Sequence, residues 1–103
     1  MIWITLLACG APELEDAHDE AAAAYCDRAI TCDWIPVAQE QECLDTMEPI
    51  FSSEWTIARC EDNIGRAAWK DCEDALGLMA CDNEGWGIHN IPGECDESIL
   101  CNG

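Results

Sequence analysis

The sequence carries nine cysteines in 103 residues, and Cys9 differs from the others in its setting. Cys9 directly follows Leu6, Leu7 and Ala8, which is the pattern of a bacterial lipobox, where the cysteine is lipidated and becomes the mature N-terminus. The remaining eight form the even number that a four-disulfide domain needs. They are Cys26, Cys32, Cys43, Cys60, Cys72, Cys81, Cys95 and Cys101. The cysteines therefore predict an exported, membrane-tethered and oxidised small domain.

Disulfides explain these eight cysteines better than a metal site. Their density is close to that of disulfide scaffolds, which belong to oxidising compartments. Successive cysteines lie 6, 11, 17, 12, 9, 14 and 6 residues apart, and none of these intervals resembles paired zinc-ligand spacing. Acidic residues flank most of the cysteines, which raises thiol pKa values and disfavours redox catalysis. We therefore predict structural bridges, with no metal and no cofactor.

The net charge of −18, from 22 acidic against four basic residues, narrows the possible partners. No basic patch can form to neutralise phosphates, so nucleic-acid binding is disfavoured. Anionic lipid surfaces should also repel the folded part. The acidity suits a solvated coat, weak association with cations, or a basic protein partner.

The N-terminal segment divides into a leader and a tether. Residues 2–8 are too few to cross a membrane, which takes about 20 apolar residues, but they fit the apolar region of a signal peptide. This leader is short and has no Lys or Arg before the apolar run, so we expect the natural start upstream of Met1. The alternative is a buried N-terminal strand or helical turn with an odd thiol. Like charges should keep the segment up to Glu20 extended. We expect a signal peptide at 1–8, a lipidated N-terminus and acidic tether at 9–20, and a disulfide-rich helical domain at 21–103.

Apolar residues at three- and four-residue steps predict an all-α domain. Pro49 should kink or split the second helix, and Ser52 or Ser53 could cap its second piece. No strand-like alternation stands out. A short final element should carry Cys95 and Cys101. We expect a three-helix, up-down-up domain with this C-terminal element, stapled by disulfides because its core is small. The expected helices span about 17–32, 37–58 and 61–81, and a loop covers 82–93.

Helix geometry excludes some cysteine pairs. A disulfide needs Cα atoms within about 7 Å, and a helix rises about 1.5 Å per residue. Cys26 and Cys32 are expected in one helix, and so are Cys72 and Cys81. The two members of each pair would therefore lie farther apart than a disulfide allows. Bridges should join different elements. The expected pairs are Cys32 with Cys43, Cys26 with Cys72 or Cys81, and Cys60 with a C-terminal cysteine.

No catalytic or metal motif stands out. The two histidines, His18 and His89, lie outside any metal-binding pattern and are expected to be ordinary exposed residues. The three serines lie outside any nucleophile-elbow motif. Residues 82–93 match a calcium loop poorly, because Trp86 stands where an oxygen ligand is needed. We expect Trp86 to pack over the core, the alternative being contact with a ligand. The chain is therefore predicted not to be an enzyme.

Several segments together carry a resemblance to a known type of protein. They are Leu-Leu-Ala-Cys at 6–9, Tyr-Cys-Asp-Arg-Ala-Ile-Thr-Cys at 25–32, Glu-Cys-Leu at 42–44, Arg-Cys at 59–60, Trp-Lys-Asp-Cys at 69–72, Leu-Met-Ala-Cys at 78–81, and the final Cys95 and Cys101. With these segments, which cover most of the chain, the sequence resembles the small cysteine-rich lipoproteins of myxobacterial type. The resemblance implies secreted helical hairpins stapled by disulfides and anchored by lipid, and it implies no established activity.

From these features we expect a non-catalytic structural or interaction module at the cell envelope, held in the outer membrane or at the cell surface by a lipid anchor such as palmitate at Cys9. Lipoprotein diacylglyceryl transferase and signal peptidase II would act on it during maturation. A protein partner, of unknown identity, would fit the interaction role. The alternative is a freely secreted disulfide-rich binding or inhibitor protein that uses the 82–93 loop. A cation-buffering acidic protein is a third interpretation.

Overall fold

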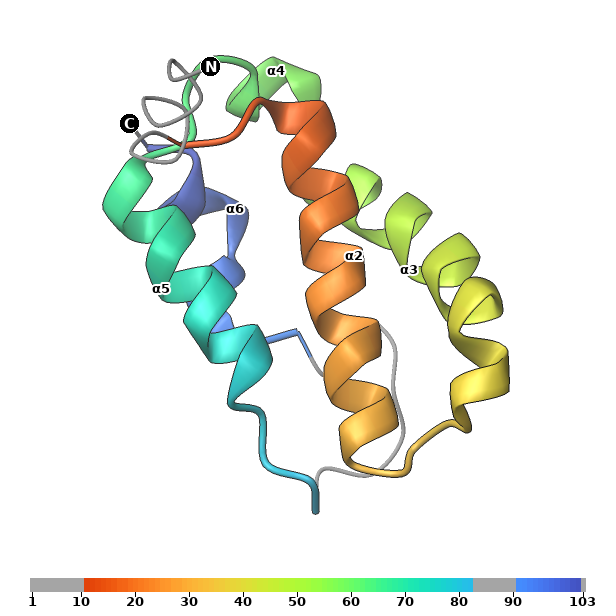
Figure 1. Ribbon diagram of the computed structural model, residues 1–103. Helices are drawn as coiled ribbons and strands as arrows, with labels where there is room; N and C mark the ends of the chain where they lie inside the picture. The colour runs from red at the N-terminus through yellow and green to blue at the C-terminus, as the bar shows by residue number, and fades with distance from the viewer. Residues whose placement is uncertain (1–10, 83–90, 103) are drawn as a thin grey trace, which may run out of the picture.

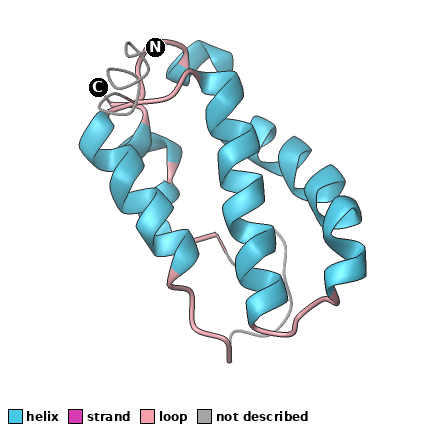
Figure 2. Cartoon of the chain, in the orientation of Figure 1, coloured by secondary structure: helices cyan, strands magenta, loops and turns pink. Residues whose placement is uncertain are grey.

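The computed structural model describes residues 11–82 and 91–102, and within that part of the chain every regular element is helical (Figure 2). The all-α prediction is therefore confirmed. The helices are α2 (Leu14–Thr31), α3 (Glu40–Glu54), α4 (Ile57–Cys60), α5 (Arg66–Gly77) and α6 (Glu97–Leu100), with 3₁₀ turns η1 (Val37–Gln39) and η3 (Gly93–Cys95).

The central helix of the domain is α2. It packs against α3 on one side and α5 on the other, and α6 and η3 pack against α5. Figure 1 shows α2 and α5 running in one direction and α3 in the other, as the up-down-up prediction requires. Ala17, Ala21 and Ala29 of α2 are fully buried. Their small side chains let both neighbouring helices approach the α2 backbone.

Helix α2 begins earlier than the sequence suggested. We expected a helix from residue 17 after a tether ending at residue 20, but α2 starts at Leu14. Leu14 and Ala17 are buried, while Glu15 and Asp16 between them are exposed and complement the positive end of the helix dipole. Charge repulsion therefore does not keep this segment extended, because the acids point outward and the apolar face is packed. Residues 14–20 belong to the domain, so the predicted boundary at residue 21 was wrong.

The second predicted helix does not divide at Pro49. Helix α3 continues through this residue. Pro49 removes a hydrogen bond to the carbonyl of Asp45, but both residues are exposed, so the freed carbonyl can bond to water instead. Ser52 and Ser53 lie inside α3, and the prediction that one of them caps a second piece was wrong.

The break comes instead at Trp55, whose backbone is extended at φ −114° and ψ 97°. Thr56 then caps α4, because its side-chain oxygen accepts a hydrogen bond from the Arg59 N–H at 3.4 Å. The expected single helix over 37–58 is therefore a 3₁₀ turn followed by two α-helices. The buried Trp55 side chain decides where the chain turns.

The third predicted helix is shorter than expected. We placed it at 61–81, whereas α5 covers 66–77. Asp62 lies before it with φ 62°, a left-handed conformation that no α-helix accommodates. Cys72 and Leu76 on the apolar face of α5 are buried, and Lys70 forms an ion pair with Asp74 at 3.5 Å on its exposed side.

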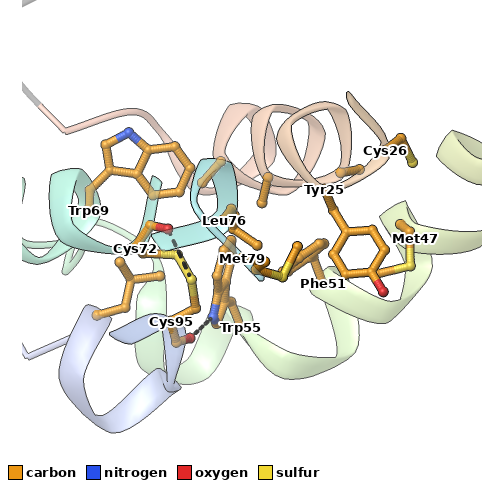
Figure 3. Close-up of a cluster of buried hydrophobic side chains, with 14 of the residues drawn as sticks. Tyr25, Cys26, Met47, Phe51, Trp55, Trp69, Cys72, Leu76, Met79 and Cys95 are labelled. Carbon is orange, nitrogen blue, oxygen red and sulfur yellow. Dashed lines mark hydrogen bonds between the residues drawn. A yellow bond between two sulfur atoms is a disulfide. The ribbon is translucent and has the colours of Figure 1, made fainter. Parts of the chain in front are cut away.

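The core is apolar throughout the described residues, with no buried polar or charged side chain among them. Trp55 is its largest fully buried side chain and lies among aromatic neighbours (Figure 3). Its ring centroid is 5.0 Å from that of Phe51 and 6.0 Å from that of Trp69, which meets it edge-on. The indole Nε1–H donates to the Cys95 carbonyl at 2.7 Å, which satisfies both buried groups.

Four disulfides staple the helices. The pairs are Cys26–Cys43, Cys32–Cys81, Cys60–Cys101 and Cys72–Cys95, with Cα–Cα distances of 5.9, 5.0, 4.8 and 4.7 Å. The exclusion of Cys26–Cys32 and of Cys72–Cys81 is confirmed, as is the pairing of Cys60 with a C-terminal cysteine. The predicted Cys32–Cys43 bridge was wrong, and so was the pairing of Cys26 with Cys72 or Cys81.

The orientation of α2 explains these two errors. Cys26 and Cys32 are six residues apart, which turns them about 120° from each other around a helix of 3.6 residues per turn. Cys26 therefore faces α3 and meets Cys43, whereas Cys32, at the C-cap of α2, meets Cys81 on the segment after α5. Cys32 and Cys43 are close in sequence because the connection between α2 and α3 is short, but their side chains point to different neighbours.

Candidate functional site

A cavity of about 540 Å³ opens where the N-terminal end of α2, the C-terminal end of α3 and α4 meet. We call it the acidic pocket. Figure 1 shows these three segments together at one end of the domain. Among the described residues, its lining combines five carboxylates with five other side chains. The carboxylates are Glu13, Glu15, Glu48, Glu61 and Asp62, and the others are Leu14, His18, Ser52, Trp55 and Ile57.

A ring stack and two hydrogen bonds hold His18 in the acidic pocket. Its ring stacks on Trp55 with centroids 6.1 Å apart and planes 18° from parallel. Nε2 lies 3.0 Å from the Trp55 carbonyl, and Nδ1 lies 3.3 Å from the Ser52 hydroxyl. The carbonyl can only accept, so the neutral imidazole carries its proton on Nε2 and accepts the Ser52 proton at Nδ1. His18 thus ties α2 to the end of α3.

The hydroxyl–imidazole pair has the residue types of an activated nucleophile, but the surrounding donors do not form an oxyanion hole. Acyl transfer needs free N–H groups aimed at the developing negative charge. Ser52 lies inside α3, where backbone N–H groups bond within the helix. The Trp55 N–H bonds back into α3, and the Thr56 N–H donates to Glu97 at 2.9 Å.

The five carboxylates give the acidic pocket a negative potential, because all of them are exposed and no Lys or Arg lies in its lining. A concave surface lined by one sign of charge concentrates ions of the opposite sign. Ile57 adds an apolar contact at this pocket, since its side chain is 69% exposed. The pocket therefore suits a group that combines a positive charge with an apolar stem.

Hydrogen bonds from Thr56 fix α4, one wall of this pocket, to α6. The backbone N–H and the hydroxyl of Thr56 donate to Glu97 at 2.9 and 2.8 Å, and these bonds hold the pKa of Glu97 below its ordinary value. In the same way, hydrogen bonds from the Ser98 hydroxyl and N–H lower the pKa of Asp96, which caps α6. Both carboxylates therefore stay ionised, and keep these hydrogen bonds, well below neutral pH.

The residues singled out from the sequence fall into three groups. The eight paired cysteines are bound to each other, and within the described residues no cluster of His, Cys, Asp or Glu is arranged to hold a metal ion. His18, expected to be exposed in a tether, is half-buried in α2 and lines the pocket. Cys9, Trp86, His89 and most of the 82–93 loop lie outside the described residues.

The sequence did not predict the acidic pocket, because the first helix was expected to begin at residue 17 and not at Leu14. The apolar spacing of α2 continues toward the N-terminus through Ala21, Ala17 and Leu14. His18 directly follows Ala17. That spacing was the available signal in the sequence. No helix in the described ranges has the length and apolarity to cross a membrane.

Comparison with known proteins identifies one family. The sequence model of a family described as a family of unknown function (DUF6184) matches residues 26–103. This span begins at Cys26 and includes all eight bridged cysteines, whereas Cys9 and the α2 part of the acidic pocket precede it. No curated protein and no solved structure matches the chain.

Proposed function

The chain belongs to this family of unknown function, DUF6184, and from its own residues we propose that it is a membrane-anchored bacterial lipoprotein whose helical domain is a non-catalytic interaction module at the cell envelope. One observation carries the proposal. The four bridges use eight of the nine cysteines, so Cys9 has no cysteine left to pair with inside the chain. It is also the cysteine that follows Leu-Leu-Ala.

Lipidation would make Cys9 the first residue of the mature protein. A diacylglyceryl transferase would join a diacylglycerol to the Cys9 sulfur through a thioether, signal peptidase II would cleave before Cys9, and the new amine would be acylated. One acyl chain gives marginal membrane binding, whereas several anchor a protein stably.

Anchoring at Cys9 would keep the acidic pocket near the lipid. Leu14, the first residue of α2, is five residues after Cys9, and an extended chain spans at most about 3.6 Å per residue, so the start of α2 would lie within roughly 18 Å of the anchor. The charge of −18 opposes contact of the domain with anionic head groups. A partner protein close to the membrane is therefore the favoured contact.

We expect the Cys9→Ser substitution to move the protein from the membrane fraction to the soluble fraction, because serine cannot form the thioether. Gly10→Ala is the matched control, since it changes the next residue and keeps the thiol. Fractionation followed by mass spectrometry of the N-terminal peptide measures both. A native protein that is soluble, with Met1 retained and Cys9 unmodified, would overturn the anchor and leave the secreted alternative.

The chemistry of the acidic pocket supports a partner that presents an arginine or lysine side chain. A guanidinium forms paired hydrogen bonds with a carboxylate and stacks on planar rings. The acidic pocket supplies exposed carboxylates beside the His18 ring, and Ile57 can contact the aliphatic stem. These features support a basic protein segment as the ligand.

A short arginine peptide should bind at the acidic pocket and shift the NMR signals of His18 and Ile57. Individual exposed ion pairs contribute about 0.2–1 kcal/mol, so the double substitution Glu48→Gln and Glu61→Gln should weaken binding by about twofold to thirtyfold. Glu40→Gln with Asp71→Asn makes the same change in net charge away from the pocket and should have a smaller effect. Equal losses in the two double variants would contradict a localised site.

A further inference from the structure

One of the four disulfides is far more accessible than the others. The six cysteines of the other three bridges are between 0% and 6% exposed. Cys81, by contrast, is an exposed residue and Cys32 is half-buried. The buried cysteines are Cys26, Cys43, Cys60, Cys72, Cys95 and Cys101.

The accessible bridge lies at the end of α2 opposite the acidic pocket. It joins the α2 C-cap to the segment that follows α5, and Figure 1 shows these two parts of the chain reaching the same end of the domain. Two hydrogen bonds accompany it. The Trp34 indole N–H donates to the Cys81 carbonyl at 3.0 Å, and Arg28 Nε–H donates to the Met79 carbonyl at 2.7 Å.

We propose that Cys32–Cys81 is a site of thiol–disulfide exchange with external thiols, and that the other three bridges are inert in the folded protein. An external thiolate attacks Sγ of Cys81, the more exposed residue of the pair, and forms a mixed disulfide while the Cys32 thiolate leaves. A second external thiolate then attacks the external sulfur of the mixed disulfide and releases the Cys81 thiolate. Two external thiols are oxidised to a disulfide, and their two protons pass to Cys32 and Cys81.

Access, and not the neighbouring charge, distinguishes this bridge. Asp33 and Asp82 adjoin its two cysteines, but every other bridge also has an acidic residue beside at least one cysteine, so carboxylate repulsion slows all four. Attack requires the thiolate to approach a sulfur directly, and the buried sulfurs deny that approach. Arg28 precedes Cys32 by one helical turn and can stabilise the leaving thiolate, but Arg59 likewise adjoins Cys60 of another bridge.

Reduction of Cys32–Cys81 would loosen the contact between the end of α2 and the segment after α5, while the other three disulfides stay closed. Cys26–Cys43 joins α2 to α3, Cys60–Cys101 joins α4 to α6, and Cys72–Cys95 joins α5 to η3. Cys32–Cys81 is the bridge that connects α2 to the α5 side. Its reduction would therefore free residues 78–82 and the end of α2, and the remaining helices would stay packed.

Stepwise reduction of the full chain tests the proposal. Free thiols, including Cys9 where it is unmodified, are first blocked with one alkylating label. The native protein is then titrated with dithiothreitol in one arm and glutathione in another, and a second, isotopically distinct label marks the thiols that appear. Peptide mapping should show a doubly labelled species at Cys32 and Cys81, formed at least tenfold faster than labelling at any other bridge. Earlier or simultaneous labelling of another bridge would overturn the proposal.

A variant and a second readout separate exchange from unfolding. The double substitution Cys32→Ala and Cys81→Ala should give no doubly labelled species at the same reductant concentrations. Hydrogen exchange of the doubly labelled wild-type chain should be faster at 78–82 and at the end of α2, with α3 and α6 unchanged. Accelerated exchange across all helices would show that the first reduction unfolds the domain, and would refute a local site.

Discussion

Replacing Trp55 with alanine should lower the free energy of unfolding by about 3–5 kcal/mol, the range found when a large buried aromatic side chain is truncated. Trp55 is fully buried and contacts Phe51, Trp69 and His18, so its loss leaves a cavity between helices that cannot easily collapse. The Cys95 carbonyl also loses its donor. Denaturant unfolding under oxidising conditions, followed by circular dichroism, measures the change.

One further substitution separates the contribution of packing to this loss of stability from that of hydrogen bonding, and a second serves as the control. Trp55→Phe keeps most of the ring but removes the N–H donor, and an unpaired buried acceptor costs about 1–3 kcal/mol. Trp34→Ala is the matched control, because Trp34 is half-buried and its indole bonds to an exposed carbonyl, so its loss should cost less than that of Trp55. A Trp55→Ala variant as stable as the Trp34→Ala variant would show that the core does not centre on Trp55.

Removing the Cys60–Cys101 bridge by a double alanine substitution should destabilise the domain by about 3 kcal/mol, the value that loop-closure entropy gives when the intact Cys72–Cys95 bridge shortens the enclosed loop to roughly 20 residues. The two cysteines are 41 residues apart in sequence and buried. The bridge also joins α4 to α6, which have four residues each and are too short to persist alone. Thermal unfolding measures the loss of stability, and hydrogen exchange should show both short helices opening first.

The control for this bridge is Ile99→Ala. Ile99 lies on α6 but is 54% exposed, so its truncation changes the same helix without affecting the disulfide and should alter stability by less than about 0.5 kcal/mol. If the double alanine variant unfolded at the wild-type temperature, the staple would contribute nothing and packing alone would hold α4 and α6.

The helices could be predicted because their signals are local. Apolar spacing indicated three long helices in an up-down-up order, and the rise of a helix ruled out Cys26–Cys32 and Cys72–Cys81. Boundaries were less predictable. The break after α3 depends on Trp55 entering a core built from distant residues, and the start of α5 depends on the left-handed Asp62. Neither event is visible in the residues immediately around it.

The acidic pocket could be predicted only in part. An excess of carboxylates and a basic partner followed from the composition, but His18 was assigned to a tether. Its role depends on the Trp55 carbonyl, 37 residues away, and on Ser52, 34 residues away. Contacts of such separation form only after α2 and α3 have packed, so no local pattern in the sequence marks them.

The sequence by itself determined an all-helical chain, an even set of eight bridging cysteines, an odd Cys9 in a Leu-Leu-Ala-Cys motif, and a strongly acidic surface. These properties follow from residue types and from spacings within a few helical turns. The tertiary structure decided which cysteines pair, which bridge stays accessible and where the carboxylates surround a cavity. Those outcomes depend on how each helix is rotated about its axis, and the burial of side chains far apart in the sequence sets that rotation.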